Sequence, residues 1–154
     1  MAASIVINTL AKHEPPTQQQ FAAAADMVAR FAQSWNAPQA ESLRELMHED
    51  TQNLIPPMTA PADREGVVQY FRQVLERFPD MRLDIIRWAP TGDMVLIEWL
   101  ATATVAGSPL SWTGIDRFRI RGDRMDQGQV YWDTRGVAER VAQLMQGQQG
   151  AAVS

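Results

Sequence analysis

Residues 112–134, WTGIDRFRIRGDRMDQGQVYWDT, decide the fold of this chain. They predict two β-strands joined by a tight turn at Arg-Gly-Asp, residues 121–123. Because alternate side chains of a strand face opposite sides, the first strand has an arginine-rich row and a mostly apolar row that begins with Trp112. The arginine row is expected to face water, so the apolar row faces inward and carries one carboxylate, Asp116. An unpaired buried charge is costly, so we expect Asp116 either to have a buried partner or to line a cavity.

The composition excludes several classes of protein and of site. The chain has 154 residues, with 14 Lys and Arg against 18 Asp and Glu, for a net charge of −4. A mildly acidic chain without a basic cluster argues against a nucleic-acid partner. The absence of cysteine excludes disulfides, thiol nucleophiles and thiolate metal sites. The N-terminus does not resemble a signal peptide and no apolar run reaches membrane-spanning length. We therefore predict a soluble, cytoplasmic protein without a membrane partner.

Three helices are predicted ahead of the strands. The first begins with a capping-box pattern at Thr17 and Gln20. Its inward face is marked by apolar residues at helical spacing: Phe21, Ala25, Val28, Phe31, Ala32 and Trp35. Pro38 is suited to the first position of a second helix, and Asp63 to the cap of a third. These helices span about residues 17–36, 38–48 and 63–78, with a short strand at 51–55 between the last two.

Beyond Pro79 the hydrophobic period changes from that of a helix to that of a strand. Strands are expected at residues 81–88 and 94–105, followed by the quoted pair and a closing helix at 135–145. Helices followed by a meander of strands are typical of an α+β fold. We expect a curved antiparallel sheet wrapped around the N-terminal helices, a cone-shaped, cystatin-like α+β barrel with an apolar hollow for a small ligand. The predicted organisation is an N-terminal arm at 1–16, one domain at 17–146 and a disordered tail at 147–154.

Three stretches resemble a known family. They are LMHEDT at 46–51, PPM at 56–58 followed by REGV at 64–67, and GIDRFR at 114–119 together with VYWD at 130–133. These stretches resemble the nuclear transport factor 2-like superfamily, which includes SnoaL-like polyketide cyclases, ketosteroid isomerases and limonene epoxide hydrolases. The resemblance covers about residues 20–140. It implies the fold described above and a homodimer formed through the outer face of the sheet.

The resemblance also implies which catalytic groups the chain has kept. In ketosteroid isomerases a strand aspartic acid stays protonated and donates a hydrogen bond to the substrate oxyanion, and Asp116 matches that position. The general base of the isomerases matches Ile55, and their oxyanion tyrosine matches Phe31. Neither side chain can replace the group it matches. The standard isomerase mechanism is therefore disfavoured.

The epoxide hydrolases of this fold use an arginine and two aspartates, at positions that match Trp99, Ala101 and Val130. None of these three can do that chemistry, so the standard hydrolase mechanism is disfavoured as well. Asn53 lies near the position where those hydrolases hold their water. SnoaL-like cyclases are more varied, so departure from any single catalytic triad counts less against membership of that group.

We predict a catalytic role for Asp116, as proton donor or hydrogen-bond donor, with Asn53 as a polar assistant. The alternative for Asp116 is a structural carboxylate, and for Asn53 an amide at a turn or strand edge. His48 is expected to interact with a helix C-terminus rather than to act as a base, and Asp133 to pair with Arg117 or Arg119 on the outer face. No metal site and no cofactor are predicted, because the chain has two histidines and no phosphate-binding or dinucleotide motif.

The predicted ligand pocket is mostly aromatic. Its side chains would enclose a flat or hydrophobic ligand, or else pack together as an ordinary core: Phe31, Trp35, Ile55, Met58, Trp99, Trp112, Phe118, Val130 and Trp132. The leading hypothesis is a SnoaL-like protein that binds a polyketide-, terpene- or steroid-like molecule. As an enzyme it would catalyse cyclisation, isomerisation or dehydration by proton transfer. The alternatives are a non-catalytic carrier and an epoxide or lactone hydrolase with a non-standard water site.

Overall fold

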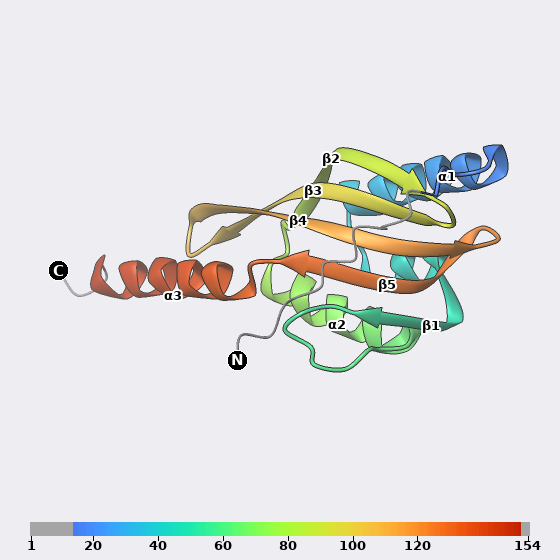
Figure 1. Cartoon of the computed structure of the whole chain (residues 1–154). Coiled ribbons are helices and arrows are strands. Elements are labelled where there is room, and N and C mark those ends of the chain that lie inside the picture. The colour runs from blue at the N-terminus through green and yellow to red at the C-terminus, as the bar shows by residue number, and fades with distance from the viewer. Residues whose placement is uncertain (1–13, 152–154) are drawn as a thin grey trace, which may run out of the picture.

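The structure is a computed structural model that describes residues 14–151 of the chain. It has the predicted α+β architecture, in which helices precede a five-stranded sheet (Figure 1). In chain order the elements are α1 (Gln18–Asn36), the 3-10 helix η1 (Ala40–Leu46), β1 (Met47–Leu54), α2 (Arg64–Arg77), β2 (Arg82–Thr91), β3 (Met94–Val105), β4 (Ser108–Arg121), β5 (Arg124–Trp132) and α3 (Thr134–Ala151).

The strands are arranged in the order β1-β5-β4-β3-β2. The run from β2 to β5 is the predicted antiparallel meander, and its turn at residues 121–123 places Gly122 at a φ of 67°, which glycine adopts without strain. β1 differs from the prediction, because it pairs in parallel with β5. The sheet is therefore mixed rather than wholly antiparallel. This pairing brings the chain around Asn53 beside β5, next to the strand that carries Asp116.

Local side-chain caps fix the starts of the first two long helices. The Thr17 hydroxyl accepts from the Gln20 N–H at 3.1 Å, and the Gln20 side chain accepts from the Thr17 N–H at 2.8 Å. Asp63 Oδ1 accepts from the Gly66 N–H at 2.8 Å. Both predicted caps are confirmed. One prediction about the inward face of α1 is wrong, since Phe21 is 50% exposed and packs at the edge of the fold against Trp88.

The segment between α1 and β1 departs most from the prediction. The second helix is a 3-10 helix that ends at Leu46, and the following strand begins at Met47 rather than at residue 51. His48 is therefore a strand residue and not the end of a helix. Its Nε2 lies 2.6 Å from the carbonyl oxygen of Arg121, so the predicted interaction with a helix C-terminus does not occur.

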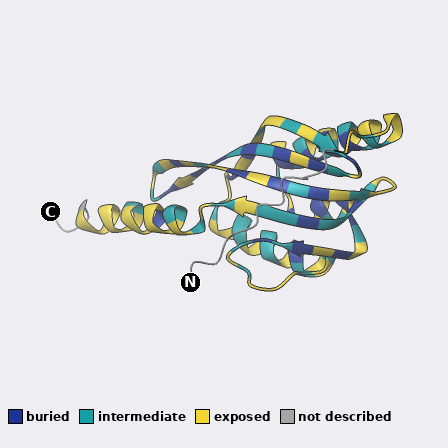
Figure 2. Ribbon diagram, viewed as in Figure 1, coloured by how far each residue is buried: buried dark blue, intermediate teal, exposed yellow. Residues whose placement is uncertain are grey.

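The two faces of the sheet differ as predicted. Along β4 the row that includes Gly114, Asp116 and Phe118 is buried, and the alternate row faces outward (Figure 2). α1 and α2 lie on the inner side, where they cover the sheet. On the outer side Arg119 pairs with Asp126 at 2.8 Å. The predicted partner of the outer arginines, Asp133, instead caps α3 by accepting from the Gly136 N–H at 2.8 Å.

The C-terminal helix is longer than predicted. α3 continues to Ala151, so residues 147–151 are helical rather than disordered, and the helix extends beyond the end of the sheet (Figure 1). Its buried side packs on a small cluster of Val105, Leu110 and Val141, separate from the main core. Of the predicted N-terminal arm, residues 1–13 lie outside the described residues. The carbonyl of Glu14 accepts from the Gly92 N–H at 2.9 Å at the β2–β3 turn.

Candidate functional site

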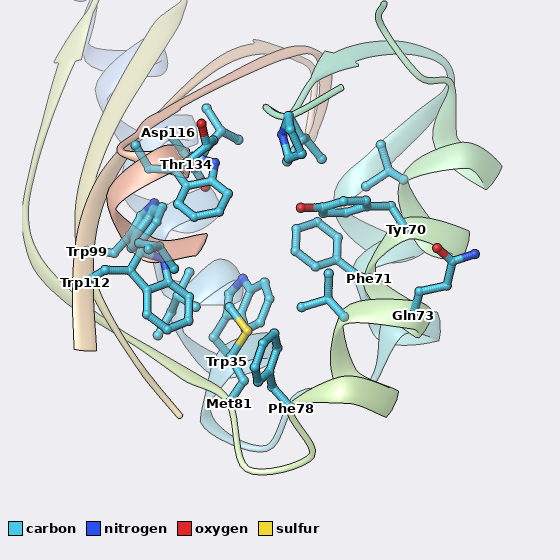
Figure 3. Close-up of a pocket in the computed structure, with 18 of the residues that line it drawn as sticks. Trp35, Tyr70, Phe71, Gln73, Phe78, Met81, Trp99, Trp112, Asp116 and Thr134 are labelled. Carbon is cyan, nitrogen blue, oxygen red and sulfur yellow. The ribbon is translucent and has the colours of Figure 1, made fainter. Parts of the chain in front are cut away.

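A cavity of about 710 Å³ lies between the inner face of the sheet and the three α-helices. This volume is within the range of small-molecule binding sites. Figure 3 shows two opposing walls, with Trp99, Trp112 and Asp116 on the sheet side and Tyr70, Phe71 and Gln73 on α2. The hollow expected from a curled sheet is therefore present. α3 closes one further side with Val137 and Val141 among other residues.

Aromatic side chains form most of the wall and hold one another in place. Phe31 meets Phe118 edge-on with ring centroids 5.5 Å apart, and Trp35 meets Phe71 edge-on at 5.3 Å. Edge contacts of this kind are favourable arrangements for aromatic rings. Aromatic rings thus connect the sheet to α1 and connect α1 to α2, while the cavity between these elements stays open.

Trp112 and Trp132 form a further part of the wall, with ring centroids 6.3 Å apart. Trp132 is fixed in orientation, because its Nε1 donates to the carbonyl oxygen of Pro56 at 2.9 Å. Pro56 and Pro57 are joined by a cis peptide bond in the loop that follows β1. The proline loop and the end of β5 thus meet at this side of the cavity.

Asp116 is the one acidic side chain that lines the cavity within the described part of the chain. It is 6% exposed, and its Oδ1 has no hydrogen-bond partner there. Its neighbours across the sheet are Ile97 on β3 and Val130 on β5, both apolar. Burial raises the pKa of Asp116 to about 7, and an interaction with the Trp99 side chain partly opposes this rise. The carboxyl group is therefore able to gain or lose a proton near neutral pH.

Trp99 reaches the same side of the cavity because Gly114 lies opposite it in the sheet. A Cβ atom at Gly114 would overlap the indole ring, so only glycine lets the ring lie over the strand. Trp99 is 4% exposed, and its Nε1 has no hydrogen-bond partner among residues 14–151. The same is true of Trp35 Nε1 on α1. Buried groups in this state are uncommon in proteins.

Asn53 is buried on β1 and also lines the cavity. Its Nδ2 donates to Thr51 Oγ1 at 2.9 Å, and its side chain lies over Gly128, where a Cβ atom would overlap Asn53 Oδ1. Asn53 pairs with Gly128, and Asp116 lies one strand further, so roughly 10 Å of sheet separates the two residues. Both predicted polar residues thus face one cavity without touching each other.

Comparison with protein-family models matches residues 28–127 to the SnoaL-like domain. The chain belongs to the SnoaL-like domain family. Similar solved structures include IdmH, a "putative polyketide cyclase" from Streptomyces antibioticus, which is 24% identical with a TM-score of 0.68 and covers 77% of this chain and 98% of its own. A loop-truncation variant of IdmH is 26% identical over the same shares, with a TM-score of 0.69.

Two further solved structures share the SnoaL-like fold. A "putative polyketide cyclase" from Acidithiobacillus ferrooxidans is 21% identical, with a TM-score of 0.68, and covers 79% of this chain and 96% of its own. TerC, crystallised with polyporic acid, is 17% identical, with a TM-score of 0.64, and covers 80% of this chain and 98% of its own. No curated protein matches the sequence.

The SnoaL-like cavity contains every residue predicted for it except one. Met58 packs against the core but is not among the residues that line the cavity. The apolar and aromatic residues that do line it as expected are Phe31, Trp35, Ile55, Trp99, Trp112, Phe118, Val130 and Trp132.

Sequence reasoning missed the contributions of α2 and α3. Tyr70 lies on the cavity face of α2, and its hydroxyl points into the open volume (Figure 3). Burial raises the pKa of Tyr70, so the phenol stays protonated. Its position three residues after Val67 and four before Val74 was a usable signal, since these residues share a helix face. For α3 the spacing of Val137, Val141 and Leu144 likewise predicts an apolar face, but the part of the sheet that this face meets depends on non-local contacts with β3 and β4.

The described residues contain neither a metal-binding cluster nor a membrane-spanning helix. Among residues 14–151 no group of three or more His, Cys, Asp and Glu side chains is arranged to hold a metal ion. None of the described helices combines the length and the apolar character that a membrane span requires.

Proposed function

We propose that this SnoaL-like protein binds a small, largely apolar molecule in the cavity and catalyses a cofactor-free proton transfer beside a carbonyl group. The reaction class is cyclisation, isomerisation or dehydration. The observation that carries the proposal is Asp116, a buried carboxyl group with an unpartnered oxygen on the wall of an apolar cavity. Groups with this combination of burial and perturbed pKa are enriched at functional sites.

The role of Asp116 follows from its surroundings. In the neutral form its O–H donates to a carbonyl oxygen of the ligand, and the bond strengthens as negative charge develops there. With a pKa of about 7, the same group can deliver or accept a proton without a large energetic penalty. The aromatic walls exclude water and orient the ligand. Val130, which pairs with Asp116 across the sheet, and Ile55, which lines the same cavity, are apolar and cannot carry a proton. The second proton carrier in this reaction is a group of the substrate, a water molecule or the Tyr70 hydroxyl, which points into the cavity.

The relatives support the class of ligand. IdmH is named as a "putative polyketide cyclase", and TerC was crystallised with polyporic acid. A cavity of about 710 Å³ with aromatic walls suits a polycyclic or linear apolar skeleton such as a polyketide, terpene or steroid. The carrier alternative is favoured by one observation, which is the apolar side chain of Ile55 at the position that matches the isomerase base.

The test uses exchange of hydrogen for deuterium, which requires no knowledge of the natural substrate. The full chain is incubated in D₂O with 2-acetylnaphthalene, and deuterium uptake into the methyl group beside the carbonyl is followed by NMR. We expect exchange above the buffer rate, and a loss of more than about a hundredfold in Asp116→Asn with ketone affinity retained. Binding without exchange in the wild-type chain would support the carrier, and absence of both would contradict the proposal.

We also propose that the chain forms a homodimer through the outer face of the sheet. Large apolar side chains are exposed there on three neighbouring strands: Leu96 at 38%, Ile115 at 40% and Tyr131 at 49%. Ile115 lies directly opposite Tyr131, and Leu96 is a diagonal neighbour of Ile115, so these residues form a continuous patch. A patch of this kind on an otherwise charged face is typical of a protein interface. A second copy of the chain is the proposed partner.

A further inference from the structure

The exposed part of the cavity lining shows where the cavity opens. No strand residue of the lining is exposed. The exposed lining residues come from the proline loop, from the C-terminal half of α2 and from α3: Pro57, Gln73, Arg77, Arg135, Ala138, Ala142 and Met145. The mouth of the cavity therefore lies between α2 and α3, away from the buried sheet wall.

Both cationic side chains of the lining lie at this mouth. Arg77 and Arg135 are exposed, whereas Asp116, the one acidic lining residue in the described part of the chain, is buried. A guanidinium group stays charged at all accessible pH values. The mouth is therefore positive, although the whole chain has a net charge of −4. A positive entrance to an apolar cavity attracts anionic ligands from solution.

Arg77 is the cation that is free to meet a ligand. Its Cζ lies 5.2 Å from the ring centroid of Phe78, and Figure 3 shows Phe78 across the open volume from Asp116. Among residues 14–151 Arg77 forms no ion pair, whereas Arg135 pairs with Glu139 at 2.8 Å. Arg77 can thus bind an anion without giving up an existing partner.

We propose that Arg77 binds the carboxylate of an amphipathic ligand at the mouth, while the apolar skeleton of the ligand fills the cavity. A guanidinium group matches a carboxylate with two parallel hydrogen bonds. Arg135 adds positive charge from the α3 side of the mouth. In this orientation the acid group keeps its contact with water. In the reverse orientation it would meet apolar walls and Asp116, a site where burial disfavours negative charge.

This inference deepens the proposed function and rests on it in one respect. If the carbonyl group of the ligand lies near Asp116, as that function requires, then the carboxylate lies at the other end of the skeleton. The substrate class is thus an oxo acid, with an apolar or aromatic body between an enolisable carbonyl group and a remote carboxylate. Binding of the carboxylate by Arg77 does not itself depend on catalysis.

The test compares 6-acetyl-2-naphthoic acid with its methyl ester by titration calorimetry of the full chain at pH 7.5. The measured quantity is the ratio of the two dissociation constants, because general changes in the cavity cancel in it. Arg77→Gln should lower the preference for the acid by roughly 2- to 5-fold, and Arg77→Lys should keep most of it. Arg72→Gln is the matched control, since Arg72 lies on the same helix, pairs with Glu41 and does not line the cavity.

A second variant should act in the opposite direction. Glu139→Gln frees Arg135 from its partner and should raise the preference for the acid. A preference that Arg77→Gln leaves unchanged, or that Arg72→Gln lowers to the same extent, would overturn the inference. Preference for the acid through Arg77 in a chain that exchanges no deuterium would uphold the inference and contradict only the catalytic part of the proposed function. Failure of both compounds to bind would contradict the two proposals together.

Discussion

Replacement of Asp116 by asparagine should change how the stability of the protein depends on pH. The carboxyl group is buried among apolar neighbours, and its pKa rises from an ordinary value of 3.8 to about 7. The difference is about 3 pH units at about 1.4 kcal/mol each, so ionised Asp116 opposes folding by about 4 kcal/mol above pH 7. Asparagine has nearly the same shape and no charge at any of these pH values. The asparagine therefore removes the contribution of Asp116 to the pH dependence of stability without creating a new void.

The direction of the effect follows from proton binding. Between about pH 4 and pH 7 the folded chain keeps a proton on Asp116, whereas the unfolded chain has released it. The unfolded state therefore binds fewer protons, and the contribution of Asp116 to the free energy of unfolding falls as the pH rises through this window. Above pH 7 both states are ionised and the contribution is constant. Between pH 5 and pH 8 the stability of Asp116→Asn should rise by about 3 kcal/mol relative to that of the wild-type chain.

Urea unfolding followed by tryptophan fluorescence at pH 5, 6, 7 and 8 measures this difference. Subtraction of the variant from the wild-type chain cancels the contributions of all other groups. Asp126→Asn is a control that should stay flat from pH 5 to pH 8, since hydrogen bonding to Arg119 holds the pKa of Asp126 below its usual value of 3.8 and both states are ionised in this range. Its contribution to stability is present at neutral pH and is lost on acidification. A difference between wild type and Asp116→Asn that stays flat from pH 5 to pH 8 would refute the assignment of a buried, protonated Asp116.

Two further predictions concern the sheet. Gly128→Ala should destabilise the chain by about 1–3 kcal/mol in urea unfolding, because the new Cβ overlaps the Asn53 side chain. Gly147→Ala on the open surface of α3 should stabilise it by up to about 1 kcal/mol, and equal effects at both positions would contradict the steric argument. Ile115→Lys should shift the sedimentation coefficient from dimer to monomer, whereas Gln148→Lys on α3 should not. A wild-type chain that sediments as a monomer would remove the basis for the proposed interface.

Sequence predicted the parts of the structure that neighbouring residues decide. The cap at Thr17 and the turn at Gly122 are set by side-chain chemistry within a few positions, and both are confirmed. The inward row of β4 is set by strand alternation, which placed Asp116 correctly on the buried face. The overall order of elements followed from the change of hydrophobic period along the chain, and the structure confirms it.

The errors arose where distant segments meet. β1 begins at Met47 because residues 47–54 pair in parallel with β5, about 75 positions later in the chain. The polar stretch at its start gives no local sign of a strand. Asp133 is a different case, because its bond to Gly136 spans three residues and was open to local reasoning. Tyr70 shares a helix face with Val67 and Val74, but the contact of that face with the cavity depends on how α2 packs against the sheet. Local patterns cannot determine contacts of this range.

The attachment of α3 separates access to the cavity from the stability of the fold. This helix provides part of the cavity wall and is held by the small cluster of Val105, Leu110 and Val141, which meets the main core through Phe78 and Trp112. A substitution that loosens this cluster is expected to displace α3 from the cavity wall, while the five strands keep their hydrogen-bonded pairing. Substitutions at Val141 should therefore change the rates of ligand binding and release, whereas substitutions at Phe118, in the main core, should change the stability of the fold.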